Sequence, residues 1–334
     1  MASNVHWLQH HWYRTTPLHL ILLPVSLLFR LLVALRRDLY SSGFLGSEQL
    51  LLPVIVVGNI SVGGTGKTPL TLALAQHLIE NDWHPLIISR GYKRATQRPQ
   101  QVDPGMPATQ AGDEPLLMAQ RNLCPVWVGK NRVATAHAAL QAHPQCDVVL
   151  SDDGLQHYRL RRDIEIVVID GERGMGNGFL LPAGPLREPI SRLETVDAVV
   201  VNGSKADTGQ FKMSLEGVTF YQLLNPSQTA TASDFQDKNN HAVAGIGHPQ
   251  RYFQHLQTLG ITFTPHAFPD HHPYSASDLQ FTDCDAVLLT EKDAVKCTAF
   301  ADARYWVLRV DAQIDSGLTD LILRKIKPHG SETA

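Results

Sequence analysis

The stretch at residues 54–74 constrains the fold of this chain more than any other. It reads VIVVGNISVGGTGKTPLTLAL, an apolar β-branched run followed by a glycine-rich loop and a helix-forming segment. The loop ends in Gly66-Lys67-Thr68, and a strand, a glycine-rich loop with a lysine, and a helix in this order are typical of a phosphate-binding P-loop. The sequence therefore predicts a nucleoside triphosphate site on an α/β fold.

The chemistry of phosphate binding explains the residue types found in this loop. Glycines let the backbone turn tightly and bring its N–H groups against phosphate oxygens. Lys67 is expected to reach the β- and γ-phosphates, and the Thr68 hydroxyl to occupy a Mg²⁺ coordination position. The predicted nucleotide-binding residues are Ser61, Val62, Gly63, Gly64, Thr65, Gly66, Lys67 and Thr68. Ser61 replaces the first glycine of the common pattern, and the alternative is a glycine-rich turn that binds nothing, which the flanking strand and helix disfavour.

The composition is that of an ordinary globular protein. Of 334 residues, 43% are hydrophobic and 18% are charged, which argues against wholesale disorder and leaves room for one large domain or two unequal ones. The formal net charge of -3 and the lack of a basic stripe predict no nucleic-acid partner. The four cysteines show neither close pairing nor metal spacing, so we expect reduced thiols.

Residues 18–35 form the second informative feature. They read LHLILLPVSLLFRLLVAL, a run about long enough to cross the hydrocarbon core of a membrane, although Pro24 and Arg30 interrupt it. The segment could span the membrane, lie in its interface with arginines reaching the headgroups, or pack as a buried helix. Aromatic residues just upstream suit an interfacial anchor: Trp7, Trp12 and Tyr13. We expect membrane association, mainly as a shallow or monotopic anchor.

Apolar runs typical of buried strands recur along the rest of the chain. They occupy 84–89, 125–128, 147–151, 164–169 and 197–202, with helix candidates between them at 69–81, 114–122 and 131–142. Strands that alternate with helices, and that are continuously apolar, predict an α/β fold with a mostly parallel, doubly wound sheet of the P-loop NTPase type.

A polar connector at 203–240 precedes a second, shorter α/β pattern, which ends near residue 310. This change of composition indicates a second, smaller α/β lobe. The predicted organisation is an apolar anchor region with a membrane-associated helix (1–45), a P-loop core (46–215) and a linker with the smaller lobe (216–334).

Paired acids follow the predicted strand at 147–151. Asp152 and Asp153 stand at its carboxyl end, the edge where open α/β sheets bind ligands. A P-loop needs a carboxylate at this place to organise the Mg²⁺ shell. A plain strand-end turn is the alternative interpretation, and Asp170 after the next strand is a weaker candidate.

Three further elements each allow two interpretations. Asp113 directly precedes the helix predicted at 114–122, where an aspartate is most simply explained as an N-cap, and Glu114 stands beside it. The loop SRGYKR at 89–94 either binds an anionic substrate or is a solvated basic loop. Separately, Arg132 follows the strand at 125–128 and could lie near a γ-phosphate. The segment FPDHHP at 268–273 resembles half a metal site without a clustered partner; a solvent-facing turn is the default, and catalysis by one of its histidines the sharper option.

Taken together, these motifs closely resemble one family, the tetraacyldisaccharide 4′-kinases (lipid A 4′-kinases) of Gram-negative bacteria. The matching elements are VGNISVGGTGKTP (57–69), SRGYKR (89–94), GDEP (112–115), VGKNR (128–132), SDDGLQH (151–157), PAGPLREP (182–189), FPDHHPY (268–274) and LLTEKDAVKC (288–297). Ser61 belongs to this family's own loop. The resemblance implies a P-loop kinase at the cytoplasmic face of the inner membrane. It implies transfer of the ATP γ-phosphoryl group to the 4′-hydroxyl of tetraacyldisaccharide 1-phosphate.

The resemblance also implies a role for each site. Asp113 is implied to be the general base that takes the sugar hydroxyl proton, and His271 to pair with it, with His272 as the less favoured alternative. Lys67 is implied to bind phosphate at the catalytic centre, and Arg132 to stabilise charge on the transferring phosphoryl group. The implied Mg²⁺ residues are Thr68, Asp152, Asp153 and Glu114.

A further set of residues is implied to contact substrate or to close the site: Arg90, Lys93, Arg94, Arg187 and Glu188. The expected cofactors are ATP and Mg²⁺, and the expected partners are the lipid-linked disaccharide and the membrane surface. Because Asp113 and His271 come from different predicted lobes, lobe closure is expected to complete the site and to limit ATP hydrolysis.

Three rival functions fit the P-loop less well. Val62 stands where dimeric switch ATPases carry a signature lysine, and the segment TEKD at 290–293 misplaces the lysine of a guanine-binding motif. A nucleic-acid-stimulated ATPase is disfavoured by the net charge. A membrane scaffold with a vestigial nucleotide site is disfavoured because Lys67, Thr68 and the acidic pair are all retained.

Overall fold

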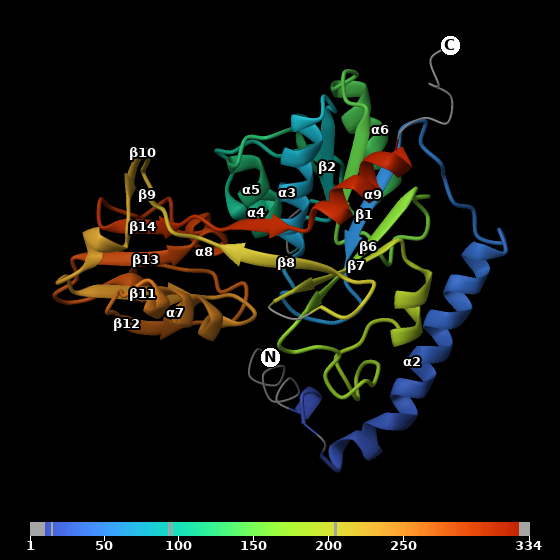
Figure 1. The fold of residues 1–334 in the computed structure, drawn as a ribbon, viewed down its shortest axis with the longest axis horizontal. Helices are drawn as coiled ribbons and strands as arrows, with labels where there is room; N and C mark the ends of the chain where they lie inside the picture. Colours follow the sequence, from blue (N-terminus) through green and yellow to red (C-terminus); the bar gives the residue numbers. More distant parts are fainter. Residues whose placement is uncertain (1–10, 15, 93, 95, 204–205, 327–334) are drawn as a thin grey trace.

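The computed structural model describes residues 11–14, 16–92, 94, 96–203 and 206–326. Two α/β lobes lie side by side, and one long helix runs along the outside of the larger lobe (Figure 1). The expected substrate residue Lys93 and the expected anchor residue Trp7 fall outside the described residues.

The larger lobe is built on a sheet whose nine described strands follow the order β15-β8-β7-β6-β1-β5-β2-β4-β3. Seven neighbouring strands run parallel to one another. They are β1 (Val54–Gly58), β2 (Pro85–Ser89), β4 (Val126–Val128), β5 (Val148–Asp152), β6 (Ile164–Asp170), β7 (Ala198–Asn202) and β8 (Phe211–Glu216). Except for β8, these strands are almost fully buried, which explains their continuous apolar sequences. The expected parallel, doubly wound sheet is confirmed.

Helices pack on both faces of this sheet. One face carries α3 (Lys67–Glu80), α5 (Asp113–Gln120) and α9 (Ser316–Ile326), with the short α4 (Ala108–Ala111) leading into α5. The other face carries α6 (Arg132–Ala142). Successive residues of β1 point to opposite faces, so Ile55 packs in the first core and Val56 in the second.

The carboxyl ends of the parallel strands β1, β2, β4 and β5 open at one edge of the sheet. The loops that follow these strands begin at Asn59, Arg90, Gly129 and Asp153. Parallel pairing therefore brings the P-loop together with three other loops that sequence analysis singled out.

The smaller lobe is built on a sheet whose six described strands follow the order β10-β9-β14-β13-β11-β12. They are β9 (Phe220–Gln222), β10 (Asn225–Ala230), β11 (Asn240–Ala244), β12 (Thr264–Ala267), β13 (Ala286–Thr290) and β14 (Tyr305–Leu308). Four of these strands are parallel, and α7 (Pro249–Thr258) packs on one face while α8 (Glu291–Ala294) follows β13. A second α/β lobe was expected, and it forms its own core.

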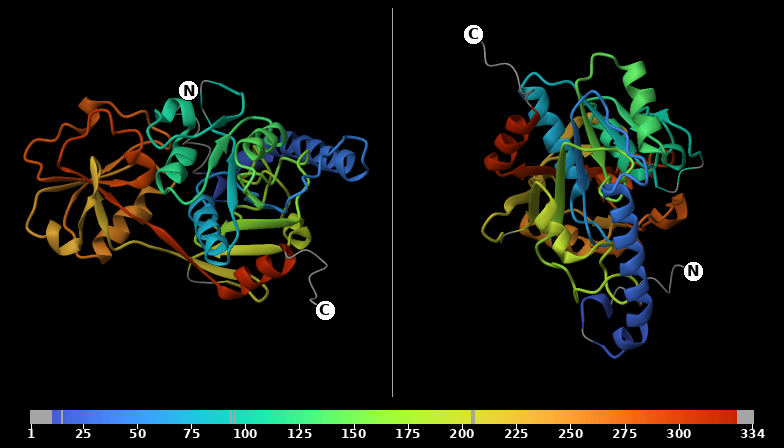
Figure 2. Two further views of the ribbon diagram at one scale, coloured as in Figure 1. Left: turned by 90° about the horizontal axis from the view of Figure 1, so that it is seen from above. Right: turned by 90° about the vertical axis from the view of Figure 1, so that its right-hand side faces the viewer.

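The chain crosses between the lobes twice (Figure 2). The chain leaves the larger lobe after β8, and β15 (Asp311–Ile314) returns to pair with β8 in antiparallel register at the edge of the larger sheet. Helix α9 then packs in the core of the larger lobe. The expected range of 216–334 for the smaller lobe is therefore too long, because β15 and α9 belong to the larger lobe. The sequence of a short strand does not indicate which sheet the strand joins.

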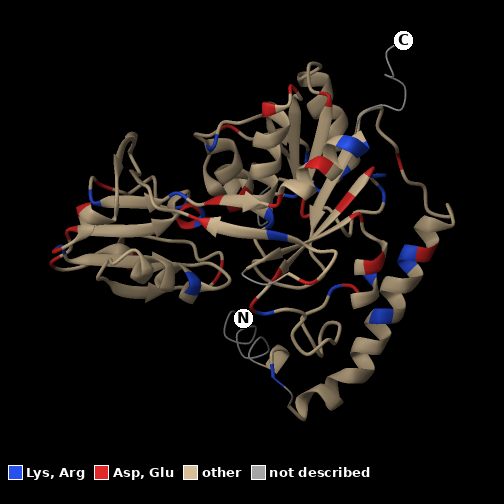
Figure 3. Cartoon of the chain, viewed as in Figure 1, with Lys and Arg blue, Asp and Glu red and all other residues tan. Residues whose placement is uncertain are grey.

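Helix α2 (Leu18–Ser41) runs along the larger lobe with most of its side chains exposed. It has 24 residues, a mean hydropathy of 2.3 and the length needed to cross a membrane. Its described charged residues lie toward its carboxyl-terminal half (Figure 3). Two buried polar side chains attach the helix to the lobe: Ser26 donates to the Leu180 carbonyl (2.7 Å), and His19 Nδ1 lies 3.1 Å from the Ala183 carbonyl. The interpretation as a buried core helix is therefore not supported.

Candidate active site

The P-loop lies between β1 and α3 at the carboxyl edge of the larger sheet. Gly66 precedes α3 with a left-handed backbone (φ 97°), and a Cβ here would lie 2.7 Å from the Asn202 amide nitrogen. Neighbouring segments brace the loop: Asn202 donates to the Thr65 carbonyl (3.1 Å), and the Val62 N–H donates to the Pro185 carbonyl (2.8 Å). The amino terminus of α3 is thus held in place as an anion site.

Lys67 and Arg187 both contact the carboxylate of Asp153. Lys67 Nζ lies 3.5 Å and Arg187 Nη1 lies 3.4 Å from Asp153 Oδ1. Burial acts to raise the pKa of Asp153, but the positive charges of Lys67, Arg187 and Arg132 outweigh it and lower the pKa below its ordinary value. Asp153 is therefore ionised at neutral pH.

Asp152 ends β5 and is fully buried. Thr71 donates to its Oδ1 (3.3 Å), and Ser89 donates to its Oδ2 (3.4 Å). Burial, followed by the negative charges of Glu114 and Asp153, raises the pKa of Asp152 well above its ordinary value. A cation bound beside Asp152 would favour the ionised form of its carboxyl group.

The chemistry of this acidic group fits Mg²⁺. Among the described residues, no three carboxylate, histidine or cysteine side chains converge as a closed metal cage. Mg²⁺ needs no such cage, because it is commonly held by one or two carboxylates together with waters and phosphate oxygens. Thr68, in the first turn of α3, offers a hydroxyl at the same edge of the sheet. The residues present therefore match a nucleotide-dependent magnesium site.

Asp113 and His271 meet at the junction of the two lobes. Nδ1 of His271 lies 2.9 Å from Oδ2 of Asp113, and the two residues are 158 positions apart in the sequence. His272 points elsewhere: its Nε2 lies 3.5 Å from Asp278, and its ring packs near Phe268. The structure thus brings the first histidine of the pair, and not the second, to Asp113.

Asp113 is the first residue of α5, and the N-cap position belongs to Gly112. The N-cap interpretation of Asp113 is therefore wrong. Burial acts to raise the pKa of Asp113, but the hydrogen bond with His271 and the charges of Lys296 and Lys292 lower it overall. The carboxylate is ionised at neutral pH, as a general base must be.

Two lysines that sequence reasoning missed complete this junction. Lys292 Nζ lies 3.0 Å from Glu114 Oε1 and 3.1 Å from Asp270 Oδ1. Lys296 Nζ lies 2.8 Å from Asp293 Oδ1 and 3.9 Å from Asp113 Oδ2. Both lysines lie in the family-like segment at 288–297, and their four-residue spacing was the available signal.

Arg132 is buried beneath the acidic strand end, with 1% of its surface exposed. Its guanidinium donates to the Gly129 carbonyl (2.9 Å) and the Asp152 carbonyl (3.1 Å). Its Nε has no hydrogen-bond partner among the described residues. Arg132 therefore places a positive charge directly behind the acidic pair.

The other expected substrate residues differ in their surroundings. Arg90 is exposed at the end of β2, on the same sheet edge. Arg94 donates to the Thr96 hydroxyl (2.6 Å) and to the Arg98 carbonyl (2.9 Å), so it fixes the shape of its own loop. Arg187 stays at the site through its contact with Asp153.

Glu188 does not suit the expected substrate contact. It is 1% exposed. It accepts hydrogen bonds from Gln156 (2.7 Å) and Tyr158 (2.7 Å) and pairs with Arg192 (3.2 Å). We correct the expectation: Glu188 holds the 156–158 turn against the segment that braces the P-loop.

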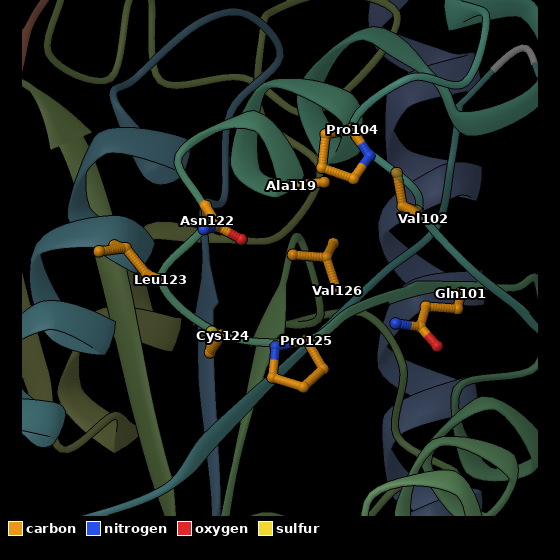
Figure 4. A pocket seen from close by; sticks show the side chains of 9 residues that line it. All are labelled: Gln101, Val102, Pro104, Ala119, Asn122, Leu123, Cys124, Pro125 and Val126. Atoms are coloured by element: carbon orange, nitrogen blue, oxygen red, sulfur yellow. The ribbon is translucent and has the colours of Figure 1, made fainter.

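A cavity of about 300 Å³ lies away from this site, beside β4 (Figure 4). Its walls include Gln101, Asn122 and Cys124 and carry no charged side chain. Burial raises the pKa of the Cys124 thiol to about 12, so this thiol is not a nucleophile at neutral pH. The cavity offers no chemistry for phosphoryl transfer.

Comparison with known proteins shows extensive similarity. The family described as tetraacyldisaccharide-1-P 4′-kinase matches residues 18–327. A tetraacyldisaccharide 4′-kinase of Methylobacillus flagellatus is 48% identical over 320 residues, which cover 96% of this chain and 96% of the relative. Another from Azoarcus sp. is 47% identical over 330 residues, which cover 97% of this chain and 96% of the relative.

The fold also has a counterpart among solved structures. A crystal structure of LpxK from Aquifex aeolicus in complex with ATP superposes with a TM-score of 0.79. The two sequences are 31% identical, and the match covers 93% of this chain and 100% of that chain. Similarity in sequence and in fold thus extends over both lobes.

Proposed function

This chain belongs to the tetraacyldisaccharide-1-P 4′-kinase family, and we propose that the residues at the junction of its two lobes carry out the family's reaction. The chain is an ATP-dependent kinase that phosphorylates the 4′-hydroxyl of tetraacyldisaccharide 1-phosphate in lipid A biosynthesis. The roles of individual residues in that reaction are the proposal.

The contact between Asp113 and His271 carries the proposal. Asp113 accepts the proton of the 4′-hydroxyl while the hydroxyl oxygen bonds to the γ-phosphorus of ATP. The bond from that phosphorus to the β-phosphate bridging oxygen breaks, and ADP leaves with the electron pair. His271 orients the carboxylate from the opposite lobe through the 2.9 Å contact at Nδ1. Because the dyad needs both lobes, closure and proton removal are linked.

Mg²⁺, when bound, neutralises charge on the phosphates. Thr68, Asp152 and Asp153 would hold it, since a hydroxyl and two carboxylates lie at the amino terminus of α3 and the end of β5. Glu114 is 3.0 Å from Lys292 and would act in the water shell around the ion. This arrangement follows the P-loop pattern in which protein oxygens supply only part of the coordination.

Lys67 and Arg132 supply the positive charge of the protein. Lys67 begins α3 and is held by Asp153, which directs its ammonium group toward the phosphate position. Arg132 lies behind Asp152 and acts from a buried position. A fixed charge in a buried site stabilises a transition state without reorganisation at the moment of reaction.

Arg90, Arg94 and Arg187 are proposed to act on the substrate side. Arg187 contacts Asp153 of the acidic pair, Arg90 follows β2 at the same sheet edge, and Arg94 shapes the basic loop. Lys93 belongs to the same loop and keeps this role as a prediction. Cations on this side would draw an anionic lipid headgroup toward the site.

Helix α2 is proposed to anchor the enzyme at the cytoplasmic face of the inner membrane. Its exposed residues include Leu20, Ile21, Leu28 and Leu31, which form an apolar surface without a partner in the described chain. Burial of such a surface in the interface is favourable. The anchor would hold the P-loop near a substrate whose acyl chains remain in the bilayer.

The proposed function is tested by a transfer assay. Purified enzyme is mixed with ATP carrying a radioactive γ-phosphate and with tetraacyldisaccharide 1-phosphate in detergent micelles, with and without Mg²⁺. Labelled lipid product that depends on Mg²⁺ supports the proposal. Equal ATP hydrolysis with and without lipid, and no labelled lipid, would contradict it.

A further inference from the structure

An arginine to which no role has been given above lies beside the P-loop. Arg173 follows β6, which pairs with β1 in parallel register, so both strands end at the same edge of the sheet. Its Nη1 lies 3.5 Å from the position of a Cβ built on Gly63, in the middle of the P-loop. Arg132, by contrast, contacts the end of β5, on the opposite side of β1. The two arginines therefore approach the P-loop from different sides.

The turn after β6 fixes the backbone of Arg173. Asp170 Oδ1 accepts hydrogen bonds from the N–H groups of Glu172 (3.0 Å) and Arg173 (3.2 Å). An aspartate turn of this kind sets the direction in which the chain continues. The guanidinium carbon of Arg173 lies 5.6 Å from the ring centroid of Tyr13, a distance that suits a cation–π contact. The side chain is thus held against the protein beside the P-loop.

The positive charge of Arg173 is not taken up by an ion pair. Its two acidic neighbours in the sequence, Asp170 and Glu172, contact Arg251 of α7 instead, at 2.9 Å and 3.1 Å. Within the described part of the chain, no aspartate or glutamate forms an ion pair with Arg173. A half-buried guanidinium in this situation suits a ligand that brings its own negative charge.

The smaller lobe holds the other edge of this guanidinium. Nη2 of Arg173 donates to the carbonyl of Gly247 (2.8 Å), in the loop between β11 and α7. The same loop touches the P-loop, because a Cβ on Gly247 would lie 3.1 Å from the backbone nitrogen of Gly64. The docked smaller lobe therefore closes against the P-loop and fixes the guanidinium there.

This position suits a contact with the phosphate that is transferred. The backbone of a P-loop cradles the β- and γ-phosphates, and an arginine beside it can neutralise charge that develops during transfer. A guanidinium presents several N–H donors in one plane. Nη1 of Arg173 can therefore bind a phosphate oxygen above Gly63 while Nη2 stays bonded to Gly247.

We propose that Arg173 is a catalytic arginine that binds the transferring γ-phosphoryl group through Nη1 when the smaller lobe is docked. The inference rests on the proposed function and adds a third positive charge to those of Lys67 and Arg132. Arg173 keeps its protons and forms no bond to phosphorus; it stabilises negative charge on the phosphoryl oxygens. Because Gly247 of the other lobe aligns it, this stabilisation is linked to lobe docking.

The test compares Arg173→Gln and Arg173→Lys with a control, Arg251→Gln. Glutamine can still donate to the Gly247 carbonyl but carries no charge, whereas lysine keeps the charge without the planar fork. Arg251 is the matched control because it joins the same two lobes through Asp170 and Glu172.

Two binding constants and one rate are measured for each protein. Calorimetry gives the Kd for ADP with Mg²⁺, and the Kd for ADP with Mg²⁺ and aluminium fluoride, which mimics the transferring phosphoryl group. The transfer assay with the lipid acceptor gives kcat. The ratio of the two Kd values is obtained within one protein, so a variant that is partly unfolded still reports it.

Arg173→Gln should lower kcat by about a hundredfold to a thousandfold, as expected when a donor to the transition state is lost. It should weaken binding of the fluoride complex by about the same factor, while the Kd for ADP stays within about twofold. Arg173→Lys should recover about tenfold of the lost kcat, because a point charge replaces the fork. Arg251→Gln should stay within about threefold of the wild type in all three quantities, because its pair is partly exposed.

Equal weakening of ADP and of the fluoride complex in Arg173→Gln would show that Arg173 only shapes the P-loop, and would overturn the proposal. Equal losses in Arg173→Gln and Arg251→Gln would assign both arginines to lobe docking and would also overturn it. In either case the wild type still transfers phosphate to the lipid. Absence of that transfer in the wild type would instead refute the proposed function.

Discussion

Nδ1 of His271, in the smaller lobe, lies 2.9 Å from Oδ2 of Asp113, in the larger lobe. Neither lobe contains both members of this pair. Lys292 and Lys296 of the smaller lobe reinforce the junction by contacting Glu114 and Asp113. The catalytic arrangement therefore depends on how the lobes are docked, and not on either sheet alone.

His271→Ala should lower kcat by about tenfold to a hundredfold, which is less than the loss expected when the base itself is removed. The carboxylate of Asp113 would remain, but it would lose the contact that orients it. The affinity for ATP should stay within about twofold, measured by calorimetric titration. His272→Ala is the control, because His272 contacts Asp278 instead. Equal kinetic losses in the two variants would contradict the assignment.

Lys296→Met should destabilise the protein by about 3 kcal/mol, because it leaves the fully buried Asp293 carboxylate without its cation. The free energy of unfolding in urea is the measurement. Arg304→Ala is the matched control, since the Arg304–Asp302 pair is exposed and should contribute at most about 1 kcal/mol. Similar destabilisation by both variants would show that the burial of the Lys296–Asp293 pair does not determine its contribution to the free energy of unfolding.

Leu28→Asp and Leu31→Asp should release the enzyme from membranes without unfolding it. Both side chains are more than half exposed (57% and 63%), so their replacement disturbs no core. A charge in the bilayer interior is costly, which weakens partitioning. Vesicle flotation measures the release, and the melting temperature checks the fold. Val218→Asp, at an equally exposed apolar position (64%) of the segment between β8 and β9, is the control and should leave flotation unchanged.

Stability should fall as the pH drops from about 6.5 to 4, partly because of His157. Its folded-state pKa is lowered to about 4, by burial first and then by Arg132, Arg90 and Arg36. In the unfolded chain, a histidine has a pKa of about 6.5, so in this window the unfolded state binds more protons and is favoured. Since the side chain is only partly buried, we expect an effect of about 1–2 kcal/mol at pH 5.

Urea unfolding of the wild type and of His157→Gln at pH 7 and pH 5 measures this effect. The wild type should lose about 1–2 kcal/mol more than the variant between the two pH values. An identical loss in both proteins would show that His157 does not titrate in this way.

Much of the larger lobe was predictable from sequence because parallel strands covered on both faces are continuously apolar, as in β1 and β6. Parallel pairing then placed the loops after those strands at one edge, so Asp152 and Lys67 could be assigned to one site. For these residues the local pattern and the tertiary arrangement agree.

The remaining features depend on contacts between distant segments. Glu188 looked like a substrate residue because a loop sequence does not reveal that Gln156, Tyr158 and Arg192 saturate its carboxylate. Asp113 looked like an N-cap because its partner lies in the other lobe. The return of β15 to the larger sheet also had no local signal, since a four-residue strand fits either sheet.

The central claim is that Asp113 removes the proton from the acceptor hydroxyl. It is tested most directly by measuring kcat and the Kd for ATP in Asp113→Asn, which keeps the shape of the side chain and removes its basicity. We expect kcat to fall by about a hundredfold to ten-thousandfold while the Kd for ATP stays within about twofold of the wild type. A normal kcat with weakened ATP binding would contradict the claim and would make Asp113 a nucleotide ligand.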